Sequence, residues 1–476
     1  MDDYTLLKTI EFYNPHFKNI ESILNVPVFR RNLYSEILKN LDNIKQIISI
    51  TGPRRVGKTT ILKQLVFDLI KQSDVSPVNI LYISMDDPYI LSKDQNTVFD
   101  EILAIYSKYI LKKKIGLDKI YFFIDEIHKF PTWELFLKKY YDKGSNIRFV
   151  ISGSVSSSIL SKSKESLAGR IKDFKIYPFS FYEFVEFNVL SNDLLDTAFR
   201  ENVIKIISSI HDVYFSFENM NFQEMLDRFK DIMVNITLYE DELFSLFYQY
   251  LTIGGFIEGW EIQGKALQYE YLYQTQIEKV LLQDIYILED IKSTSQLSNL
   301  FFKLSLDFGK ENSLNSLKTD LSLHRETLER YIKLLTDSNL IIPINKFKEN
   351  INKSSNIKIF LIDMGIRNSI FKIREEEILS DPLLFSRYIS NISLISMLQK
   401  IDRSSIEYYR DRERTIDFVI RGINGDITCN IGDKKGFESL SKKLGIEKKL
   451  VIDTKLELSY EKEILNIPYI LFLLMF

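Results

Sequence analysis

Cysteine, proline and glycine are all scarce in this chain of 476 residues, which has one cysteine, 10 prolines and 17 glycines. The single cysteine, Cys429, excludes an internal disulfide framework and suits a reducing compartment. No CxxC spacing and no Cys/His cluster occurs in the sequence, so we expect no structural zinc. Two aspartates follow Met1, where a secretory leader would carry basic and then apolar residues. We therefore expect a cytoplasmic protein.

The sequence also lacks long apolar runs and a large excess of charge of either sign. The longest apolar run, residues 467–476, is too short to cross a bilayer, so we expect no membrane span and predict a buried final strand. The formal net charge is −3 and the pI about 6.0, so nucleic acid would have to bind at a local basic patch. The length suggests roughly two to four domains.

The most specific pattern present is Gly-Pro-Arg-Arg-Val-Gly-Lys-Thr-Thr at residues 52–60, which fits G-x-x-x-x-G-K-[ST] at every fixed position. A strand-like stretch (47–50) precedes this phosphate loop and a helical pattern (61–69) follows it. Such a loop turns backbone N–H groups around a polyphosphate at a helix N-terminus. Lys58 is predicted to reach the β- and γ-phosphates, and Thr59 to bind Mg²⁺. The predicted nucleotide-binding residues are Gly52, Pro53, Arg54, Arg55, Val56, Gly57, Lys58, Thr59 and Thr60.

A second strand-like run, residues 119–126, ends in Asp125 and Glu126. Continuous apolar runs of this kind are typical of parallel strands that are buried on both faces of a sheet. A carboxylate at a strand tip beside the phosphate loop can bind Mg²⁺ and its waters, and we assign this role to Asp125. Glu126 is predicted to orient or deprotonate the attacking water. The alternative is an ordinary acidic pair at the end of a strand.

Three further residues are candidates on less specific grounds. Ser154, with Ser152 behind it, follows a strand-like run and is predicted to contact the γ-phosphate or the attacking water; a turn serine is the alternative. Arg170 is predicted to reach the γ-phosphate of a neighbouring subunit in a homo-oligomer, with a structural ion pair as the alternative. His128 is interpreted as a surface residue, or one behind the catalytic groups, rather than a base.

The ordered segments resemble prokaryotic ATPases of the AAA+ type, a group common in archaea, in which a phosphate-loop domain precedes a helical region, a winged helix and a restriction-endonuclease-like domain. The phosphate loop is generic, whereas the ordered set is specific and extends over most of residues 45–435. His128 departs from the family pattern, in which glutamine is more frequent. The matching segments are residues 52–60, 124–128, 151–154, 167–170, 177–184, 250–256, 360–365 and 415–420.

Residues 296–347 carry the pattern expected of a winged helix. Helical spacing covers residues 296–307, a short helix is predicted at 313–321, and Ser322 is predicted to cap a third helix. Such a third helix enters the major groove of DNA. Because two glutamates on its charged face would repel phosphate, a module used only for packing or subunit contacts is the alternative. The predicted apolar face of the third helix consists of Leu328, Tyr331, Ile332 and Leu335.

Three strand-like segments between residues 407 and 431 indicate a small sheet, and the resemblance implies that this sheet is nuclease-like. Asp417 matches the first metal-binding position of restriction-endonuclease-like enzymes. In register, the next strand places Asn430 and Gly432 where an active site has a carboxylate and a lysine. The helix predicted at residues 382–400 contains no acid that would replace them. We therefore expect a degenerate site.

An active nuclease is the alternative, and it would need Asp433 and Lys435. That register shift flips the faces of the strand and is disfavoured. The domain is still predicted to contact DNA or a partner, with a solvated charged face as the alternative. The lysines concerned are Lys434, Lys435, Lys442 and Lys443.

These inferences combine into an α/β fold class. We expect an AAA+-like P-loop NTPase parallel sheet (1–185), a helical lid or connector (186–290), a winged-helix domain (291–350) and a small degenerate nuclease-like domain (351–476). The expected function is that of an ATPase with ATP and Mg²⁺ as cofactors, which couples turnover to DNA binding or remodelling. A nucleotide-dependent switch that regulates a protein partner, and an ATP-controlled nuclease, are the alternatives.

Overall fold

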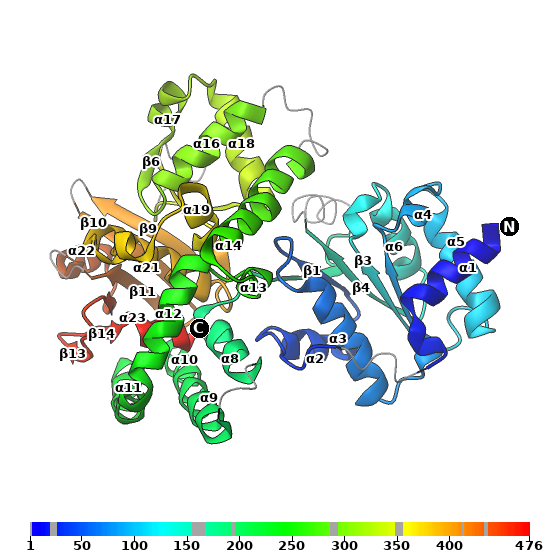
Figure 1. Cartoon of the computed structure of the whole chain (residues 1–476), viewed down its shortest axis with the longest axis horizontal. Helices are drawn as coiled ribbons and strands as arrows, with labels where there is room; N and C mark the ends of the chain where they lie inside the picture. The colour runs from blue at the N-terminus through cyan, green and yellow to red at the C-terminus, as the bar shows by residue number, and fades with distance from the viewer. Residues whose placement is uncertain are drawn as a thin grey trace. The chain divides into compact units, whose positions relative to one another are not determined.

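The computed structural model describes residues 2–19, 26–154, 167–191, 196–285, 294–347, 356–411, 414–432 and 437–476. The chain divides into two compact units, residues 1–176 and 177–476 (Figure 1). This division falls before residue 185, the predicted end of the first domain. Within the ranges described, no helix combines the length and the apolar character that a membrane span requires.

The first unit is built on a parallel sheet of five strands in the order β2-β3-β4-β1-β5. β4 lies in the sheet between β1, the strand before the phosphate loop, and β3, the acidic strand. The strands β1, β2 and β3 are buried along their whole length, as their continuous apolar sequences predict. The strands are β1 (Ile47–Thr51), β2 (Ile80–Ser84), β3 (Ile120–Asp125), β4 (Ile147–Gly153) and β5 (Ile171–Lys175).

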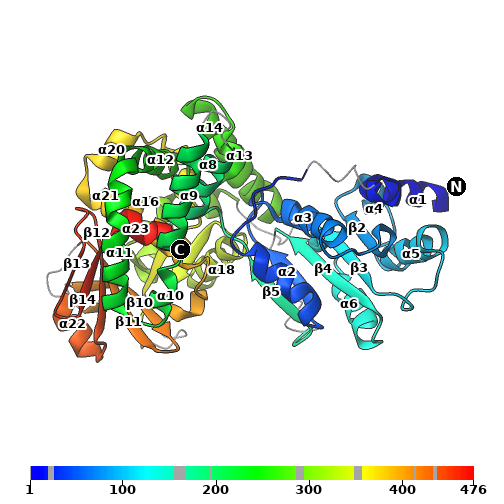
Figure 2. The same cartoon turned by 90° about the horizontal axis from the view of Figure 1, so that it is seen from below.

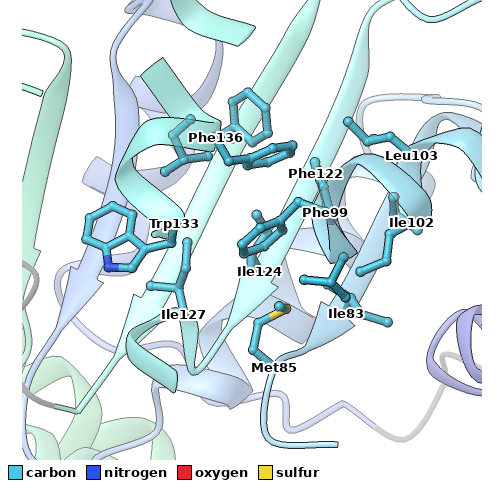
Figure 3. Packing of buried hydrophobic residues seen from close by; sticks show 14 of the residues in the cluster. Ile83, Met85, Phe99, Ile102, Leu103, Phe122, Ile124, Ile127, Trp133 and Phe136 are labelled. Carbon is cyan, nitrogen blue, oxygen red and sulfur yellow. The ribbon is translucent and has the colours of Figure 1, made fainter. Parts of the chain in front are cut away.

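Helices cover both faces of this sheet, with α3 on one face and α5 and α6 on the other (Figure 2). On the α5–α6 face, Phe99 stacks on Phe136 with ring centroids 4.5 Å apart, and Trp133 lies in the same apolar cluster as Phe122 and Ile124 (Figure 3). This core fixes the strands whose carboxyl ends form the site. The helices are α1 (Asp2–Tyr13), α2 (Tyr34–Asn43), α3 (Lys58–Lys71), α4 (Pro88–Leu91), α5 (Val98–Ile105) and α6 (Trp133–Asp142).

The edge strand β2 is covered by the short helix η1 (Pro15–Phe17) and the residue before it. The side-chain amide of Asn14 donates to the carbonyl oxygen of Tyr82 and accepts from its N–H, both at 2.7 Å. His16 Nε2 lies 3.0 Å from the carbonyl oxygen of Ile80. These side chains take the place of a neighbouring strand and satisfy backbone groups at the sheet edge.

The second unit begins with a helical region that includes a tight junction at Gly254 and Gly255. Gly254 has φ +78°, and a Cβ atom on it would overlap the side chain of Asp363. A Cβ on Gly255 would overlap the backbone of Phe179. Space therefore requires glycine at both positions. The helices of this region are α8 (Phe181–Ser191), α9 (Thr197–His211), α10 (Tyr214–Glu218), α11 (Phe222–Ile236), α12 (Glu240–Ile253), α13 (Ile257–Trp260) and α14 (Lys265–Leu272).

Asp363 is the group around which this junction is built. Its carboxylate accepts from the N–H of Gly255 at 2.7 Å and from the N–H of Gly365 at 2.8 Å, and it caps α19 (Met364–Phe371). The side chain is fully buried, and burial raises the pKa of Asp363 to about 6 although these backbone hydrogen bonds lower it. A single carboxylate thus joins two segments 108 residues apart.

Residues 294–347 and 356–361 form three helices and a three-stranded antiparallel sheet in the order β6-β8-β7. The predicted apolar face of the third helix is buried. The predicted cap is wrong, because Ser322 lies in the preceding turn with φ +51° and His324 is the N-cap. β8 extends this sheet beyond residue 350, the predicted boundary. The elements are α16 (Thr294–Leu306), β6 (Glu311–Ser313), α17 (Leu314–Asp320), α18 (Arg325–Asp337), β7 (Ile341–Ile344) and β8 (Asn356–Leu361).

The last part of the chain forms a mixed sheet in the order β13-β14-β12-β11-β10-β9. The three predicted strands are confirmed as antiparallel neighbours, and β11 then pairs in parallel with β12. The strands are β9 (Ile406–Asp411), β10 (Arg414–Gly422), β11 (Gly425–Ile431), β12 (Lys448–Asp453), β13 (Ser459–Glu461) and β14 (Ile464–Pro468), and the helices are α20 (Glu375–Leu379), α21 (Pro382–Met397), α22 (Phe437–Leu444) and α23 (Tyr469–Met475).

The predicted final strand over residues 467–476 is wrong for most of its length. Only Ile467 and Pro468 belong to β14, and the residues after them form the buried helix α23. An apolar run without polar residues carries neither a helical nor a strand period, so the sequence alone does not distinguish the two. The expectation that this segment is buried is confirmed.

Candidate functional site

The phosphate loop connects the carboxyl end of β1 to the N-terminus of α3. Gly52 is confined by space, because a Cβ atom on it would overlap the carbonyl oxygen of Ile176. Gly57 has φ +95° and forms the N-cap of α3, a conformation that favours glycine. The N-terminus of α3, which begins at Lys58, therefore faces the loop, as the motif predicts.

Two cations hold the loop in this conformation. The Lys58 amino group donates to the carbonyl oxygens of Gly52 at 3.1 Å and Pro53 at 2.6 Å. Burial lowers the pKa of Lys58 to about 8, although the nearby carboxylates oppose this shift. The buried Arg31, which the sequence reasoning missed, donates to the carbonyl oxygen of Val56 at 2.8 Å.

Asp125, at the tip of β3, is brought into direct contact with the phosphate-loop helix. Its Oδ2 accepts from Thr59 Oγ1 at 2.6 Å and from the Tyr82 hydroxyl at 2.9 Å. Its Oδ1 accepts from the Ser152 hydroxyl and from the N–H of Glu126. The side chain is almost completely buried, and these donors fix the orientation of the carboxylate.

Glu126 follows at the point where the chain turns away from the sheet, with φ +51°. Burial raises the pKa of its carboxyl group, and the nearby Lys58 opposes that shift. His128 Nδ1 lies 3.4 Å from Glu126 Oε2. The alternative of a surface residue is wrong for His128, because its side chain is only 6% exposed and burial lowers its pKa to about 3.

Ser154 and Arg170 lie at opposite ends of the first unit's sheet. Ser154 is buried directly after β4, at the edge where the phosphate loop and Asp125 lie. The carbonyl oxygen of Arg170 accepts from the N–H of Ile47, at the start of β1. Arg170 Nε also donates to Asp142 at 2.7 Å, which is the ion pair foreseen as the alternative. Within one chain, the structure does not bring Arg170 to the site.

A cavity of about 550 Å³ opens beside the contact between Thr59 and Asp125. One side of it is formed by the tips of β2 and β3 and by α3, and the other by residues near the N-terminus. Its lining includes Phe12, Tyr13, His16, Thr59, Lys63, Tyr82, Ser84, Asp86, Asp125 and Glu126.

The donor set fits a nucleotide with Mg²⁺. A hydroxyl and a carboxylate are oxygen ligands that this cation prefers, and Thr59 and Asp125 already lie within hydrogen-bonding distance of each other. The helix N-terminus and the buried ammonium group of Lys58 supply positive charge for phosphate. The sequence reasoning missed Tyr82, for which the available signal was its position two residues before the end of the strand beside β3.

The second unit contains the other predicted site. Asp417 Oδ1 accepts from Lys358 Nζ at 2.7 Å, and its Oδ2 accepts from the N–H of Ile431 at 3.0 Å. Asn430 Oδ1 accepts from the N–H of Asp417 at 3.1 Å, which agrees with the predicted register. Among the residues whose placement is described, no three His, Cys, Asp or Glu side chains are grouped as a metal site.

The lysines predicted to contact DNA or a partner are only partly described. Lys442 and Lys443 are exposed near the end of α22, and Lys443 is paired with Asp411. Asp433, Lys434 and Lys435 lie outside the described residues, as does the serine-rich stretch 156–166 before Arg170.

Comparisons with known proteins match two separate parts of the chain to family models. Residues 44–185 match a family model described as an AAA domain, and residues 245–377 match one described as a domain of unknown function. An uncharacterized protein of Methanocaldococcus jannaschii is 23% identical over 431 residues, which cover 88% of this chain and 81% of that protein. An uncharacterized protein of Haemophilus influenzae is 22% identical over 406 residues, which cover 83% of this chain and 84% of that protein.

Solved structures give more distant similarities. A Walker-type ATPase of Pyrococcus abyssi is 14% identical with a TM-score of 0.36, covering 72% of this chain and 96% of that one. The ORC1 protein of Aeropyrum pernix, solved in complex with DNA, is 9% identical with a TM-score of 0.30, covering 75% and 96%. The family match and the strand order of the parallel sheet together show that residues 44–185 are an AAA-type domain with the P-loop NTPase fold.

Proposed function

We propose that this protein is an Mg²⁺-dependent ATPase that couples ATP turnover to the binding or remodelling of DNA. The observation that carries the ATPase part is the contact between Thr59 Oγ1 and Asp125 Oδ2, with Glu126 next to it. Two potential Mg²⁺ ligands and a potential base therefore lie at the end of a phosphate loop. Such an arrangement is suited to transfer of a phosphoryl group to water.

Each site residue has a distinct role in this proposal. The loop N–H groups of residues 52–60 and the ammonium group of Lys58 bind the phosphates. Thr59 and Asp125 hold Mg²⁺, which neutralises phosphate charge when it is bound. Glu126 accepts a proton from the attacking water, and its raised pKa strengthens it as a base. Ser154 contacts the γ-phosphate or this water from the tip of β4.

The proposed link to DNA is supported by the elements between residues 294 and 361. Three helices followed by an antiparallel hairpin, with β6 as the third strand, are the parts of a winged helix. Arg330 and Lys333 lie on the exposed face of α18, where a recognition helix would approach phosphate. The nuclease-like sheet would then bind DNA and not cleave it, because Asp417, the predicted metal-binding residue, is paired with Lys358.

A second candidate is a nucleotide-dependent switch that acts on a protein partner. The observation that favours it is the mixed charge of α18, on which Arg325 is paired with Glu329 and Glu326 is exposed. Such a face is better suited to contacts with a protein than to contacts with a polyanion such as DNA. An ATP-controlled nuclease is a third candidate. A DNA-cleavage assay with Mg²⁺ in which all DNA stays intact would exclude it.

We expect steady-state ATP hydrolysis to rise severalfold with one form of DNA. The measurement compares turnover without nucleic acid and with duplex, single-stranded and branched DNA. Turnover that is equal in all four samples would favour the switch, because the ATPase would then respond to something other than DNA. If no sample shows turnover that depends on Mg²⁺, the ATPase proposal itself fails.

The proposed homo-oligomer leads to a prediction for Arg170. If Arg170 leaves Asp142 and reaches the γ-phosphate of a neighbouring subunit, Arg170→Ala lowers turnover about 1,000-fold or more. Turnover per subunit of the wild-type protein would then also rise with protein concentration. Lys172→Ala is a suitable control, since Lys172 pairs on the surface with Glu36 at 3.3 Å. Equal turnover of the Arg170→Ala variant and wild type would limit Arg170 to its ion pair.

A further inference from the structure

The hydroxyl group of Tyr82 has no place in the roles given above, although it contacts the central carboxylate of the site. Tyr82 lies on β2, is only 6% exposed, and donates to Asp125 Oδ2 at 2.9 Å. Tyr82 therefore donates a hydrogen bond to the carboxylate that is proposed to hold Mg²⁺.

The contact matters because Asp125 Oδ2 is also the oxygen that accepts from Thr59. The Tyr82 hydroxyl donates to Oδ2 and the Ser152 hydroxyl donates to Oδ1, so rotation of the Asp125 carboxylate is restricted. Hydrogen-bond partners behind a metal ligand fix its orientation, and their loss typically costs about 10- to 100-fold in metal affinity or activity.

Tyr82 is itself held by residues near the N-terminus. Asn14 hydrogen-bonds both the N–H and the carbonyl oxygen of Tyr82, and the ring of Tyr13 lies 6.2 Å from its ring. The Tyr13 hydroxyl donates to Asp87 at 3.2 Å, just beyond the end of β2. Asn14 therefore holds the backbone of Tyr82, and the hydroxyl of the same residue contacts Asp125, which also accepts from Thr59.

We propose that Tyr82 is a positioning residue that holds Asp125 in the orientation required for Mg²⁺, and that Asn14 holds Tyr82 for this purpose. The proposal rests on the proposed function, since it concerns the same metal site. It adds that residues near the N-terminus, before the first strand of the sheet, set the metal affinity of the phosphate-loop site.

The test is Tyr82→Phe, which removes one hydroxyl group and keeps the ring. Binding of a fluorescent ATP analogue is titrated with Mg²⁺ and also measured in EDTA. We expect the Mg²⁺ concentration for half-maximal tight binding to rise about 10-fold, with binding in EDTA unchanged. Tyr121→Phe is the matched control. The buried Tyr121 also donates to an aspartate, Asp42, at 2.7 Å, but it lies at the start of β3, at the end of the strands away from Asp125.

The outcomes separate this proposal from the proposed function. If the wild-type protein binds the analogue without any response to Mg²⁺, or does not bind it, the proposed function fails. If the wild type responds and Tyr82→Phe has the same Mg²⁺ requirement, the positioning role is overturned. An equal shift in Tyr121→Phe would also overturn it, because the effect would then be general to the sheet.

A second variant keeps the proposal falsifiable if Tyr82→Phe does not fold. Asn14→Ala leaves the phenol in place but removes the two hydrogen bonds to the Tyr82 backbone. It is expected to raise the Mg²⁺ requirement in the same direction. A folded Asn14→Ala protein, checked by circular dichroism, with the wild-type Mg²⁺ requirement would contradict the role given to Asn14.

Discussion

Replacing Glu126 by glutamine is expected to lower ATP turnover at least about 100-fold while nucleotide binding is retained. Glutamine keeps the shape of the side chain but does not accept a proton from water. The ligands of the phosphates and of Mg²⁺ remain in the variant, because Lys58, Thr59 and Asp125 are unchanged. The measurement is phosphate release at saturating Mg·ATP, together with binding of a fluorescent ATP analogue.

A matched control is Glu101→Gln, since Glu101 lies on α5 and is 40% exposed. Its turnover is expected to equal that of the wild type. Equal turnover of Glu126→Gln and wild type would show that another group accepts the proton. Because the carboxylate is the active form, turnover of the wild type should fall as the pH falls through the raised pKa of Glu126.

Replacing Asp363 by alanine is expected to lower the free energy of unfolding of the second unit by about 3 kcal/mol. The N–H groups of Gly255 and Gly365 would lose their acceptor in a buried place. The indole N–H of Trp260 donates to Gly254 at 2.9 Å, so its fluorescence reports on this junction. The chain has two tryptophans, and a Trp133→Phe background leaves Trp260 as the reporter in urea unfolding.

Asp381→Ala is the matched control for this loss. Asp381 also accepts from two backbone N–H groups, those of Leu383 and Leu384, but at the exposed N-terminus of α21. Water replaces an exposed acceptor, so the expected cost is about 1 kcal/mol. Equal losses in the two variants would contradict the central role assigned to burial at Asp363.

The raised pKa of Asp363 gives this junction a dependence on pH with a definite sign. The folded-state pKa of about 6 lies above the ordinary value of 3.8, so the folded protein holds the proton more tightly. The resulting stability is fully present only below the unfolded-state pKa of 3.8 and is lost as the pH rises through about 6. Relative to Asp363→Asn, which does not titrate, the wild type is expected to lose about 2 kcal/mol of unfolding free energy between pH 4 and pH 7. A constant difference would contradict the shift.

Local patterns in the sequence were sufficient to predict the phosphate loop and the acidic strand. The loop is recognisable because space requires glycine at Gly52 and the backbone angle favours glycine at Gly57. The strands β9 to β11 were also predictable, since alternation of apolar residues has a short period. Each of these features depends on residues that are neighbours along the chain.

Other features depend on which segments the fold brings together. Arg170 follows the serine-rich stretch in sequence, but the start of β5 places it at the edge opposite the phosphate loop. In the sequence, nothing distinguishes Tyr82 from an ordinary buried strand residue. Only the pairing of β2 with β3 brings its hydroxyl to Asp125. The pair Lys358–Asp417 joins residues 59 positions apart on two different sheets.

By itself, the sequence determined that this chain contains a P-loop NTPase domain and which residues form the loop and the acidic strand end, because those signals are local. The tertiary structure decided that Tyr82 and Ser152 orient Asp125, that Asp363 joins Gly255 to Gly365, and that the last apolar run forms a helix. These contacts arise from burial and strand register, which bring together groups that no local pattern relates.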